Sequence, residues 1–285
     1  MPEKEQEERQ RALRHIVSLA LEEDLDAAGD ITSRAIFGPD DRGAALVVAR
    51  EAAVVSGMAA AAEVCLQVDP ELIWLPLVGD GDVIPVGAQV ARLEGRIISI
   101  LTVERTLLNF LSRLSGVATI TERYVNRTEG LPTRIAATRK TTPGLRLAEK
   151  QAVADAGGEM HRLGLYDAVL IKDNHIAAAG GVAAAVARVR AAYAGGVDIE
   201  VEVDDVGQLE EAIQAGVGRV LLDNMTPEQV AVCVKKAAGR MVVEASGGIG
   251  LDNVRDYAEA GVDIISVGAL TRGAPGVDYS LEVEV

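Results

Sequence analysis

Positively charged side chains gather in one part of the sequence, although the chain as a whole is strongly acidic. Residues 104–172 hold 11 Lys and Arg against 7 Asp and Glu, a net charge of +4, whereas the whole chain carries −15. Arginine binds a carboxylate through two parallel hydrogen bonds, and lysine acts as a point charge. The segment therefore predicts a site for a small, multiply anionic ligand such as a dicarboxylate. The candidate side chains are Arg105, Arg139, Lys140, Arg146, His161, Arg162 and Lys172.

Two acidic residues follow this segment. Glu202 lies in DIEVEV (198–203), with Glu200 on the same side of the predicted strand, and Asp223 ends RVLLD (219–223). Carboxylate oxygens suit Mg²⁺, which is held partly through water and substrate phosphates. The pair predicts a magnesium site. The alternative is that both acids pair with neighbouring lysines and arginines, and the two interpretations are compatible.

Glycine-rich segments follow two further β-type runs. Ser246-Gly247-Gly248 comes after RMVVEA, and Gly268-Ala269 comes after VDIISV, whose last residue is Val267. Backbone N–H groups in such turns, near a helix N-terminus, bind phosphate. The alternative is that the glycines only permit tight turns. The position of both segments late in the order of strands favours phosphate binding.

The elements that position these residues are short apolar strands alternating with helical stretches. Such alternation is typical of parallel strands in βα units, and six units in a row indicate a (β/α) barrel or an incomplete one. Active-site groups of such barrels lie at the C-terminal ends of the strands, where the residues above fall. A doubly wound sheet is the alternative, but no GxGxxG follows a first strand. The strand-like segments are 133–138, 167–171, 198–203, 219–223, 240–245 and 262–267.

The first hundred residues have a different pattern. Residues 4–23 show helical spacing, GDITS (29–33) breaks it, and residues 43–100 hold short strands separated by Gly, Pro and Asp. This predicts a small α+β unit. A second helix is predicted over 103–128, with Arg105 opposite its apolar stripe, where a solvated arginine would be the simplest interpretation.

Composition excludes several classes of protein. A net charge of −15, a pI near 4.7 and 3% aromatic residues argue against binding of nucleic acid or of an anionic membrane. The apolar tract 176–197 contains two arginines and glycines at both ends, so we expect no membrane span. The charged first residues do not resemble a secretory signal, and Cys65 and Cys233 suit reduced thiols, so a cytoplasmic location is expected.

The residues also resemble a known family, quinolinate phosphoribosyltransferase, also called nicotinate-nucleotide pyrophosphorylase (carboxylating). Eight segments match in the family's order over nearly the whole chain, and TRKTTPGLR with HRLGL and LIKDNHI is a highly specific combination. The segments are GDITS (29–33), ERTLLNFLSRLSGVAT (104–119), TRKTTPGLR (138–146), HRLGLYDAVLIKDNHI (161–176), EVEV (200–203), LLDN (221–224), EASGG (244–248) and GVDIISVGALT (261–271).

The resemblance implies an α/β fold of two domains: an N-terminal α/β sandwich domain and an open, incomplete α/β barrel of seven strands. We expect the first domain at 1–108, with the tail 275–285 returning to it, and the barrel at 109–274. The resemblance implies a homodimer with shared active sites, and hexamers in some members. It also implies a pentosyltransferase that requires Mg²⁺ and joins quinolinate to phosphoribosyl pyrophosphate. The products are nicotinate mononucleotide, pyrophosphate and CO₂, in de novo NAD biosynthesis.

Site roles follow from the matching motifs. Arg105 would reach quinolinate in the partner's site, and Thr138, Arg139, Lys140, His161, Arg162 and Lys172 would form the substrate pocket. Glu202 and Asp223 would face the ribose and hold the metal, and with Lys140 and Lys172 they form the expected catalytic set. The phosphate would lie against Ser246, Gly247, Gly248, Val267, Gly268 and Ala269.

The chain departs from the family pattern in three places. Ala137, Met160 and Arg272 stand where many members have Asp, Asn and His.

Three other functions are alternatives to this one. A molybdenum-operon paralogue with a related phosphoribosyl transfer shares the fold, but the intact LIKDNH segment is against it. A class I aldolase would use Lys172 as a Schiff-base lysine. A non-catalytic anion-binding scaffold would leave Glu202 and Asp223 unexplained.

Overall fold

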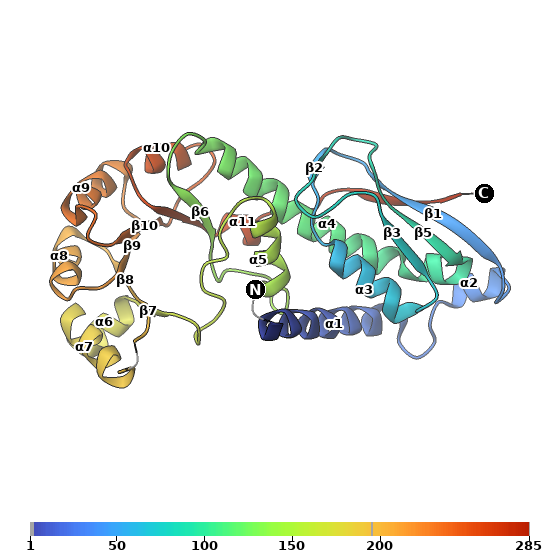
Figure 1. Cartoon of the computed structure of the whole chain (residues 1–285), viewed down its shortest axis with the longest axis horizontal. Coiled ribbons are helices and arrows are strands. Elements are labelled where there is room, and N and C mark those ends of the chain that lie inside the picture. The colour runs from blue at the N-terminus through green and yellow to red at the C-terminus, as the bar shows by residue number, and fades with distance from the viewer. Residues whose placement is uncertain (1–2, 195, 285) are drawn as a thin grey trace. The chain divides into compact units, whose positions relative to one another are not determined.

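The computed structural model describes residues 3–194 and 196–284 (Figure 1). Within these residues the chain folds into two compact units. The first comprises residues 1–122, 141–156 and 273–285, and the second comprises 123–140 and 157–272, apart from the residues outside the description. The predicted boundary between residues 108 and 109 falls inside one helix, α4 (Ile97–Arg127), which runs through the end of residues 1–122.

The first unit is built on a four-stranded antiparallel sheet with the order β12-β1-β5-β3. Alternating and apolar runs make these strands, as the sequence predicts for residues 43–100. Helix α3 packs on β3, and α1 packs on α3 and α5. The elements are α1 (Glu3–Leu25), α2 (Ile31–Ile36), β1 (Arg42–Ala49), β2 (Ala53–Val54), α3 (Met58–Val68), β3 (Ile73–Pro76), β4 (Val83–Ile84), β5 (Gln89–Arg96), α5 (Arg146–Asp155) and β12 (Tyr279–Glu284).

The C-terminal segment lies against this unit. Strand β12 pairs with β1, from Ala44 opposite Glu284 to Ala49 opposite Tyr279. The chain reaches this position by crossing α4 at Gly116, where a Cβ would come within 2.0 Å of the Pro275 carbonyl oxygen. Only glycine permits that approach. The Tyr279 hydroxyl then bonds the Ser115 hydroxyl at 2.9 Å in the core.

Two predicted features of the first unit take a definite form. The predicted stripe of α4 is buried, at Leu107, Leu111, Leu114 and Ala118, and Arg105 is exposed. GDITS, expected as a break, also begins a helix: the Asp30 carboxylate accepts the Ser33 backbone N–H at 2.9 Å and caps α2.

The second unit is a curved parallel sheet with the order β6-β11-β10-β9-β8-β7. Helices α8, α9 and α10 pack on its strands, with α7 beside α8 and α6 beside α7, outside the curve in Figure 1. The strands are β6 (Arg134–Ala137), β7 (Val169–Ile171), β8 (Ile199–Val203), β9 (Arg219–Asp223), β10 (Val242–Ser246) and β11 (Ile264–Val267). The helices are α6 (Asp173–Ala179), α7 (Val182–Ala192), α8 (Val206–Gln214), α9 (Pro227–Ala237), α10 (Val254–Glu259) and α11 (Ala269–Arg272).

All six predicted strands of this unit are present, so the open α/β barrel is confirmed. The family resemblance implied seven strands. Among the described residues the seventh position is an isolated parallel bridge, Ala136 to Glu159, beside edge strand β6. The local sequence also explains where helices begin: Thr226 and Gln229 form a reciprocal cap at the start of α9, with Pro227 in its first turn.

No helix among residues 3–194 and 196–284 combines the length and the apolar character that a membrane crossing would need.

Candidate active site

The C-terminal strand ends of the second unit surround a cavity of about 340 Å³. Most of the predicted site residues line it, because neighbouring parallel strands end at the same edge of the sheet. The predicted residues that line it are Thr138, Arg139, Lys140, His161, Arg162, Lys172, Glu202, Asp223 and Ser246. Leu170, Leu221, Glu244 and Ser266 also line it, together with Ala137.

Two guanidinium groups face this cavity and repel each other. Burial lowers the pKa of Arg162, and the positive charge of Arg139 lowers it further, against the opposing charges of Glu200, Asp167 and Glu202. The buried Nε of Arg139 has no hydrogen-bond partner among the described residues. Bringing like charges together out of water is costly unless an anion joins them. The arrangement therefore suits an anionic ligand.

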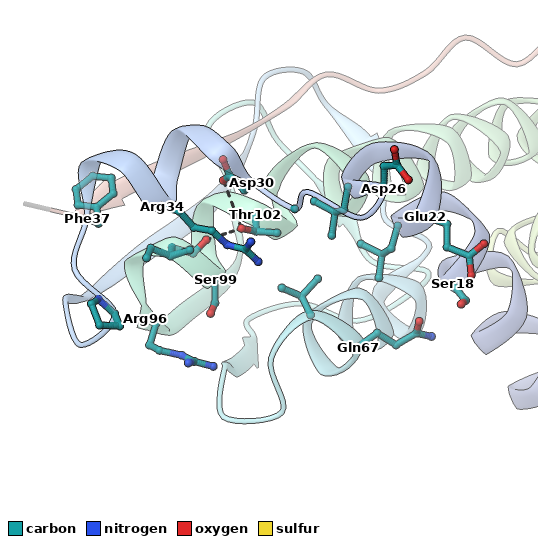
Figure 2. Close-up of a pocket in the computed structure, with 16 residues that line it drawn as sticks. Ser18, Glu22, Asp26, Asp30, Arg34, Phe37, Gln67, Arg96, Ser99 and Thr102 are labelled. Atoms are coloured by element: carbon teal, nitrogen blue, oxygen red, sulfur yellow. Dashed lines mark hydrogen bonds between the residues drawn. The ribbon is translucent and has the colours of Figure 1, made fainter.

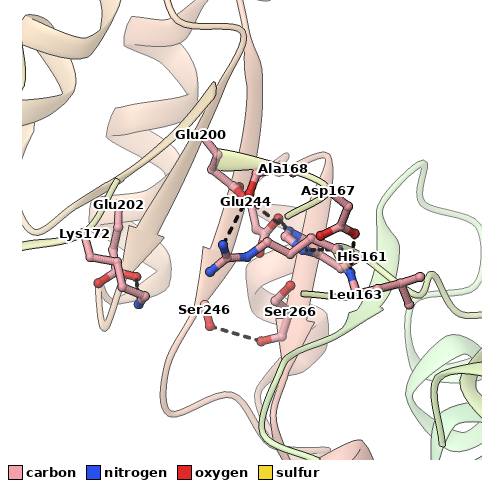
Figure 3. Close-up of polar contacts among 11 residues, drawn as sticks. His161, Leu163, Asp167, Ala168, Lys172, Glu200, Glu202, Glu244, Ser246 and Ser266 are labelled. Atoms are coloured by element: carbon pink, nitrogen blue, oxygen red, sulfur yellow. Dashed lines mark hydrogen bonds and ion pairs between the residues drawn. The ribbon is translucent and has the colours of Figure 1, made fainter. Parts of the chain in front are cut away.

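Lys172 and Glu202 form an ion pair across β7 and β8. Lys172 Nζ lies 2.5 Å from Glu202 Oε2, and the Glu202 side chain is only 11% exposed (Figure 3). Pairing with a neighbouring cation, the alternative considered for Glu202, is thus present. It leaves the second carboxylate oxygen for another partner. The His175 ring holds the start of the following helix, since its Nδ1 accepts the Lys172 backbone N–H at 3.0 Å.

The glycine segment after β10 lies next to Asp223. Ser246 is opposite Asp223 in the sheet, and the Asn224 backbone N–H donates to the Ser246 carbonyl oxygen at 2.8 Å. A Cβ on Gly247 would lie 2.9 Å from the Asn224 backbone nitrogen, and Gly247 has φ +94°. No other residue fits there without strain. The bare backbone is therefore a requirement of the turn beside Asp223.

Lys140 lies over the second glycine segment. A Cβ on Gly268 would come within 3.2 Å of the Lys140 Cδ and 3.7 Å of the Thr138 hydroxyl. The Thr138 hydroxyl accepts the Lys140 backbone N–H at 3.0 Å, and the buried Thr271 hydroxyl donates to the Lys140 carbonyl at 2.8 Å. The end of β6 therefore meets the last residue of β11, Val267, and the two residues after it, Gly268 and Ala269.

Sequence reasoning missed two buried acids of the site, Glu200 and Glu244. His161 Nε2 lies 3.0 Å from Glu244 Oε2 and 3.4 Å from Glu200 Oε2 (Figure 3). Burial lowers the pKa of His161, but the hydrogen bonds and charges of Glu200 and Glu244 outweigh it and raise the pKa to about 9. The sequence did contain a signal for these two acids. Glu200 and Glu244 stand two residues before Glu202 and Ser246 on β8 and β10, and residues two apart on a strand share a face.

The three groups share one dissociable proton. The raised pKa would put it on the ring, yet His161 Nδ1 accepts the Arg162 backbone N–H at 2.8 Å and must be unprotonated. Burial also raises the pKa of Glu200. The value of about 9 is therefore a property of the whole cluster and not of the imidazole alone.

This cluster has the spacing of a metal site but not its proton arrangement. One ligand atom from each of His161, Glu200 and Glu244 lies within 4.8 Å of the others. A neutral imidazole whose Nδ1 accepts a hydrogen bond carries its hydrogen on Nε2, which then has no lone pair for a metal. The geometry favours a hydrogen-bonded cluster.

The cluster predicts a pH dependence of stability. The ordinary pKa of histidine is 6.5 and the folded value is about 9, so the folded chain holds the proton more tightly. The stabilisation is complete below about pH 6.5 and is lost as the pH rises to about 9. We expect the unfolding free energy of the wild type, relative to His161→Gln, to fall by up to about 3 kcal/mol over this range.

Urea unfolding of both proteins at several pH values measures this difference. The comparison removes the effects of Cys65 and Tyr279, whose pKa values are each raised to about 12 by burial and which both proteins share. A difference that stays constant between about pH 6 and 9.5 would contradict the shared proton.

Arg105 and Arg146 belong to the first unit and not to the cavity's unit. Arg105 lines a separate hollow of about 320 Å³ together with Asn109, Arg113 and two acids of α1, Glu23 and Asp24. Its expected role in a partner's site requires a second chain.

Another cavity of the first unit, of about 700 Å³, lies between α1, α2 and the start of α4 (Figure 2). Asp30 and Arg34 face it, and Asp30 also accepts a hydrogen bond from the Thr102 hydroxyl at 3.4 Å. Burial alone would raise the pKa of Asp30, but its hydrogen bonds with Ser33, Thr102 and Thr32 together lower it. The predicted site residues are not among its described lining residues.

Comparisons with known proteins agree with this arrangement. Residues 30–115 match the family model "Quinolinate phosphoribosyl transferase, N-terminal domain", and residues 117–282 match that of the C-terminal domain. The chain is 43% identical to a probable nicotinate-nucleotide pyrophosphorylase [carboxylating] of Methanothermobacter thermautotrophicus, covering 89% of this chain and 93% of the relative. It is 40% identical to the corresponding protein of Bacillus subtilis, covering 90% and 88%.

A solved structure is equally similar. The nicotinate-nucleotide pyrophosphorylase of Francisella tularensis superimposes with a TM-score of 0.92 at 40% identity, covering 96% of this chain and 97% of that one. Both family models, the relatives and this structure agree over nearly the whole chain. The chain belongs to the quinolinate phosphoribosyl transferase family.

Proposed function

We propose that this chain transfers the phosphoribosyl group of phosphoribosyl pyrophosphate to quinolinate, with decarboxylation, in de novo NAD biosynthesis. The products are nicotinate mononucleotide, pyrophosphate and CO₂. One observation carries the proposal: in a member of this family, Arg139, Arg162 and Lys172 line one cavity with Glu202 and Asp223. Quinolinate carries two adjacent carboxylates on a pyridine ring, and such a cation cluster is complementary to its two negative charges.

The reaction needs little covalent help from the protein. The pyridine nitrogen forms a bond to ribose C1 as the bond from C1 to the pyrophosphate oxygen breaks, and pyrophosphate leaves with the electron pair. The bond from C2 of the pyridine to its carboxylate then breaks, CO₂ leaves, and C2 takes up a proton. The task of the site is to hold two anions in line and to stabilise the charge that develops.

Each part of the cavity has a proposed task. Arg139, His161, Arg162 and Lys172 hold the two carboxylates, with Thr138 beside them. The negative charges of Glu202 and Asp223 stabilise the positive charge that develops on the ribose, and Lys140 attracts the leaving pyrophosphate. The backbone of 246–248 and 267–269 binds the 5′-phosphate.

The donor set also suits Mg²⁺. Glu202 and Asp223 lie near the C-terminal ends of the neighbouring strands β8 and β9, line the cavity and offer hard carboxylate oxygens. They would hold the ion together with water. When bound, Mg²⁺ supplies positive charge to the pyrophosphate.

The working unit is proposed to be a homodimer in the cytoplasm. The exposed Arg105 lies outside the unit that holds the cavity, which supports its use in a partner's site. The free, buried thiols of Cys65 and Cys233 suit a reducing compartment.

The assay that tests the proposal combines the purified chain with quinolinate, phosphoribosyl pyrophosphate and Mg²⁺, and measures CO₂ and pyrophosphate. We expect equal amounts of both. Activity with nicotinate but not quinolinate, or no product, would defeat the proposal. The aldolase alternative predicts a borohydride-trapped adduct at Lys172, whose Nζ is instead engaged with Glu202.

Lys172→Ala is expected to weaken quinolinate binding about 10- to 100-fold, because a charge-assisted hydrogen bond to a carboxylate is lost. Calorimetry with quinolinate alone measures this. Lys236→Ala is the matched control, since Lys236 pairs with Glu210 at similar lysine exposure, 41% against 44%, on outer helices of the same unit. Equal affinity of both variants would remove Lys172 from the pocket.

A further inference from the structure

Glu244 has no task in the proposed reaction, although its carboxylate is the most deeply buried acid of the cavity. Its side chain is 1% exposed, and its Oε2 is the nearer of the two carboxylate oxygens around His161 Nε2, at 3.0 Å (Figure 3). Placing a carboxylate there costs free energy unless the group is used. The hydrogen bond between Glu244 and the ring identifies His161 as the residue it serves.

The hydrogen of the His161 ring is fixed by its two neighbours. Nδ1 accepts the Arg162 backbone N–H at 2.8 Å, so the ring hydrogen lies on Nε2 and points to Glu244. A neutral imidazole without an acceptor at Nε2 can carry its hydrogen on either nitrogen. A hydrogen on Nδ1 would oppose the N–H of Arg162 and break that contact.

The contact matters because the backbone turns sharply at this point. His161 has φ +53°, in the left-handed region that costs a non-glycine residue free energy and needs support from its surroundings. The next residue, Arg162, lines the cavity and extends Nη1 toward the Ala168 carbonyl oxygen at 3.5 Å. The Asp167 carboxylate accepts the backbone N–H groups of Leu163 and Gly164. The loop is thus held at both ends.

We propose, on the basis of the proposed function, that Glu244 is a positioning residue for quinolinate. By accepting the Nε2 hydrogen of His161, it keeps Nδ1 available to the Arg162 backbone. It thereby fixes the turn that presents the Arg162 guanidinium to a carboxylate of the substrate. Glu244 acts through His161 and does not touch the substrate.

Two substitutions separate acceptance of the hydrogen from negative charge. Glu244→Gln keeps an oxygen that accepts from Nε2 but removes the charge. Glu244→Leu removes the nearer acceptor at similar volume and leaves only Glu200 Oε2, at 3.4 Å from Nε2. Glu259→Gln, at an exposed position of helix α10 in the same unit, is the control for handling and folding.

The experiment is ¹⁵N NMR of the full chain labelled at histidine, with KM measured for each substrate. The chain has three histidines, and His161→Gln assigns the signal of interest. We expect Nε2–H with unprotonated Nδ1 in the wild type and in Glu244→Gln. Glu244→Leu should lose this single tautomer and raise the KM for quinolinate about 10- to 100-fold, with the KM for phosphoribosyl pyrophosphate little changed.

Several results would overturn the proposal. A wild-type His161 with its hydrogen on Nδ1 would do so even if Glu244→Leu failed to fold. So would an equal rise in quinolinate KM for the glutamine and leucine variants, or an unchanged KM for the latter. The tautomer is read without turnover. An inactive wild type with the expected tautomer would therefore count against the proposed function and not against the hydrogen-bond arrangement.

Discussion

Arg139→Ala is expected to lower kcat/KM for quinolinate by about 10²- to 10³-fold, the largest effect of a single substitution in the cavity. Removing one partner of a desolvated charge pair costs about 2–5 kcal/mol. Arg139 has a buried Nε without a hydrogen-bond partner among the described residues, and its charge lowers the pKa of Arg162. Its interactions in the absence of substrate are therefore unfavourable, and we expect the loss to appear in substrate binding.

The same reasoning predicts that Arg139→Ala leaves the thermal midpoint unchanged or higher, because repulsion of Arg162 is relieved. Arg134→Ala is the matched control. Arg134 begins the same strand, β6, and pairs with Glu159 at the opposite end from the cavity. Steady-state kinetics and thermal unfolding of both variants test the prediction. A marked loss of stability with little loss of quinolinate affinity would show that Arg139 is structural.

Mixed dimers of Arg105→Ala and Arg139→Ala chains are expected to recover about a quarter of wild-type activity at equal mixing, although each variant alone is nearly inactive. In a twofold dimer with shared sites, half of the random dimers are mixed, and one of the two sites in each is then intact. This prediction depends on the proposed role of Arg105, which is exposed on α4 in the first unit.

The measurement uses differently tagged chains that are unfolded together, refolded and purified through both tags, so that only mixed dimers remain. These should show about half of the wild-type activity. Arg123→Ala, also on α4, replaces Arg105→Ala in the control. Verified mixed dimers of the test pair with no activity would contradict a site shared between subunits.

Much of this site could be predicted because the chemistry lies at strand ends. Apolar runs separated by helical spacing identified β6 to β11 within a few residues, and parallel strands bring their C-terminal ends to one edge. Arg139, Lys172 and Asp223 each follow or end such a run. Their convergence on one cavity follows from this rule alone. The family motifs added roles to the same residues.

The limits of the two units depended on contacts between distant residues. Helix α5 lies in the first unit, where Glu149, fully buried, binds Arg113 of α4 at 2.7 Å, although α5 lies between two barrel strands in the sequence. Helical spacing shows that a helix forms there but not which partner covers it. Similarly, the predicted boundary between residues 108 and 109 falls inside a helix, because α4 continues to Arg127.

The amino-acid order alone established the strands, the residues at their ends and the cationic side chains that line the cavity, because these depend on local periodicity and on which side chains follow each run. The tertiary structure alone decided how His161 is used. Its partner Glu244 lies 83 residues away, and the two meet only after the sheet has brought β10 beside the loop that carries His161. The position of the shared proton depends on burial and hydrogen-bond geometry, which exist only in the folded chain.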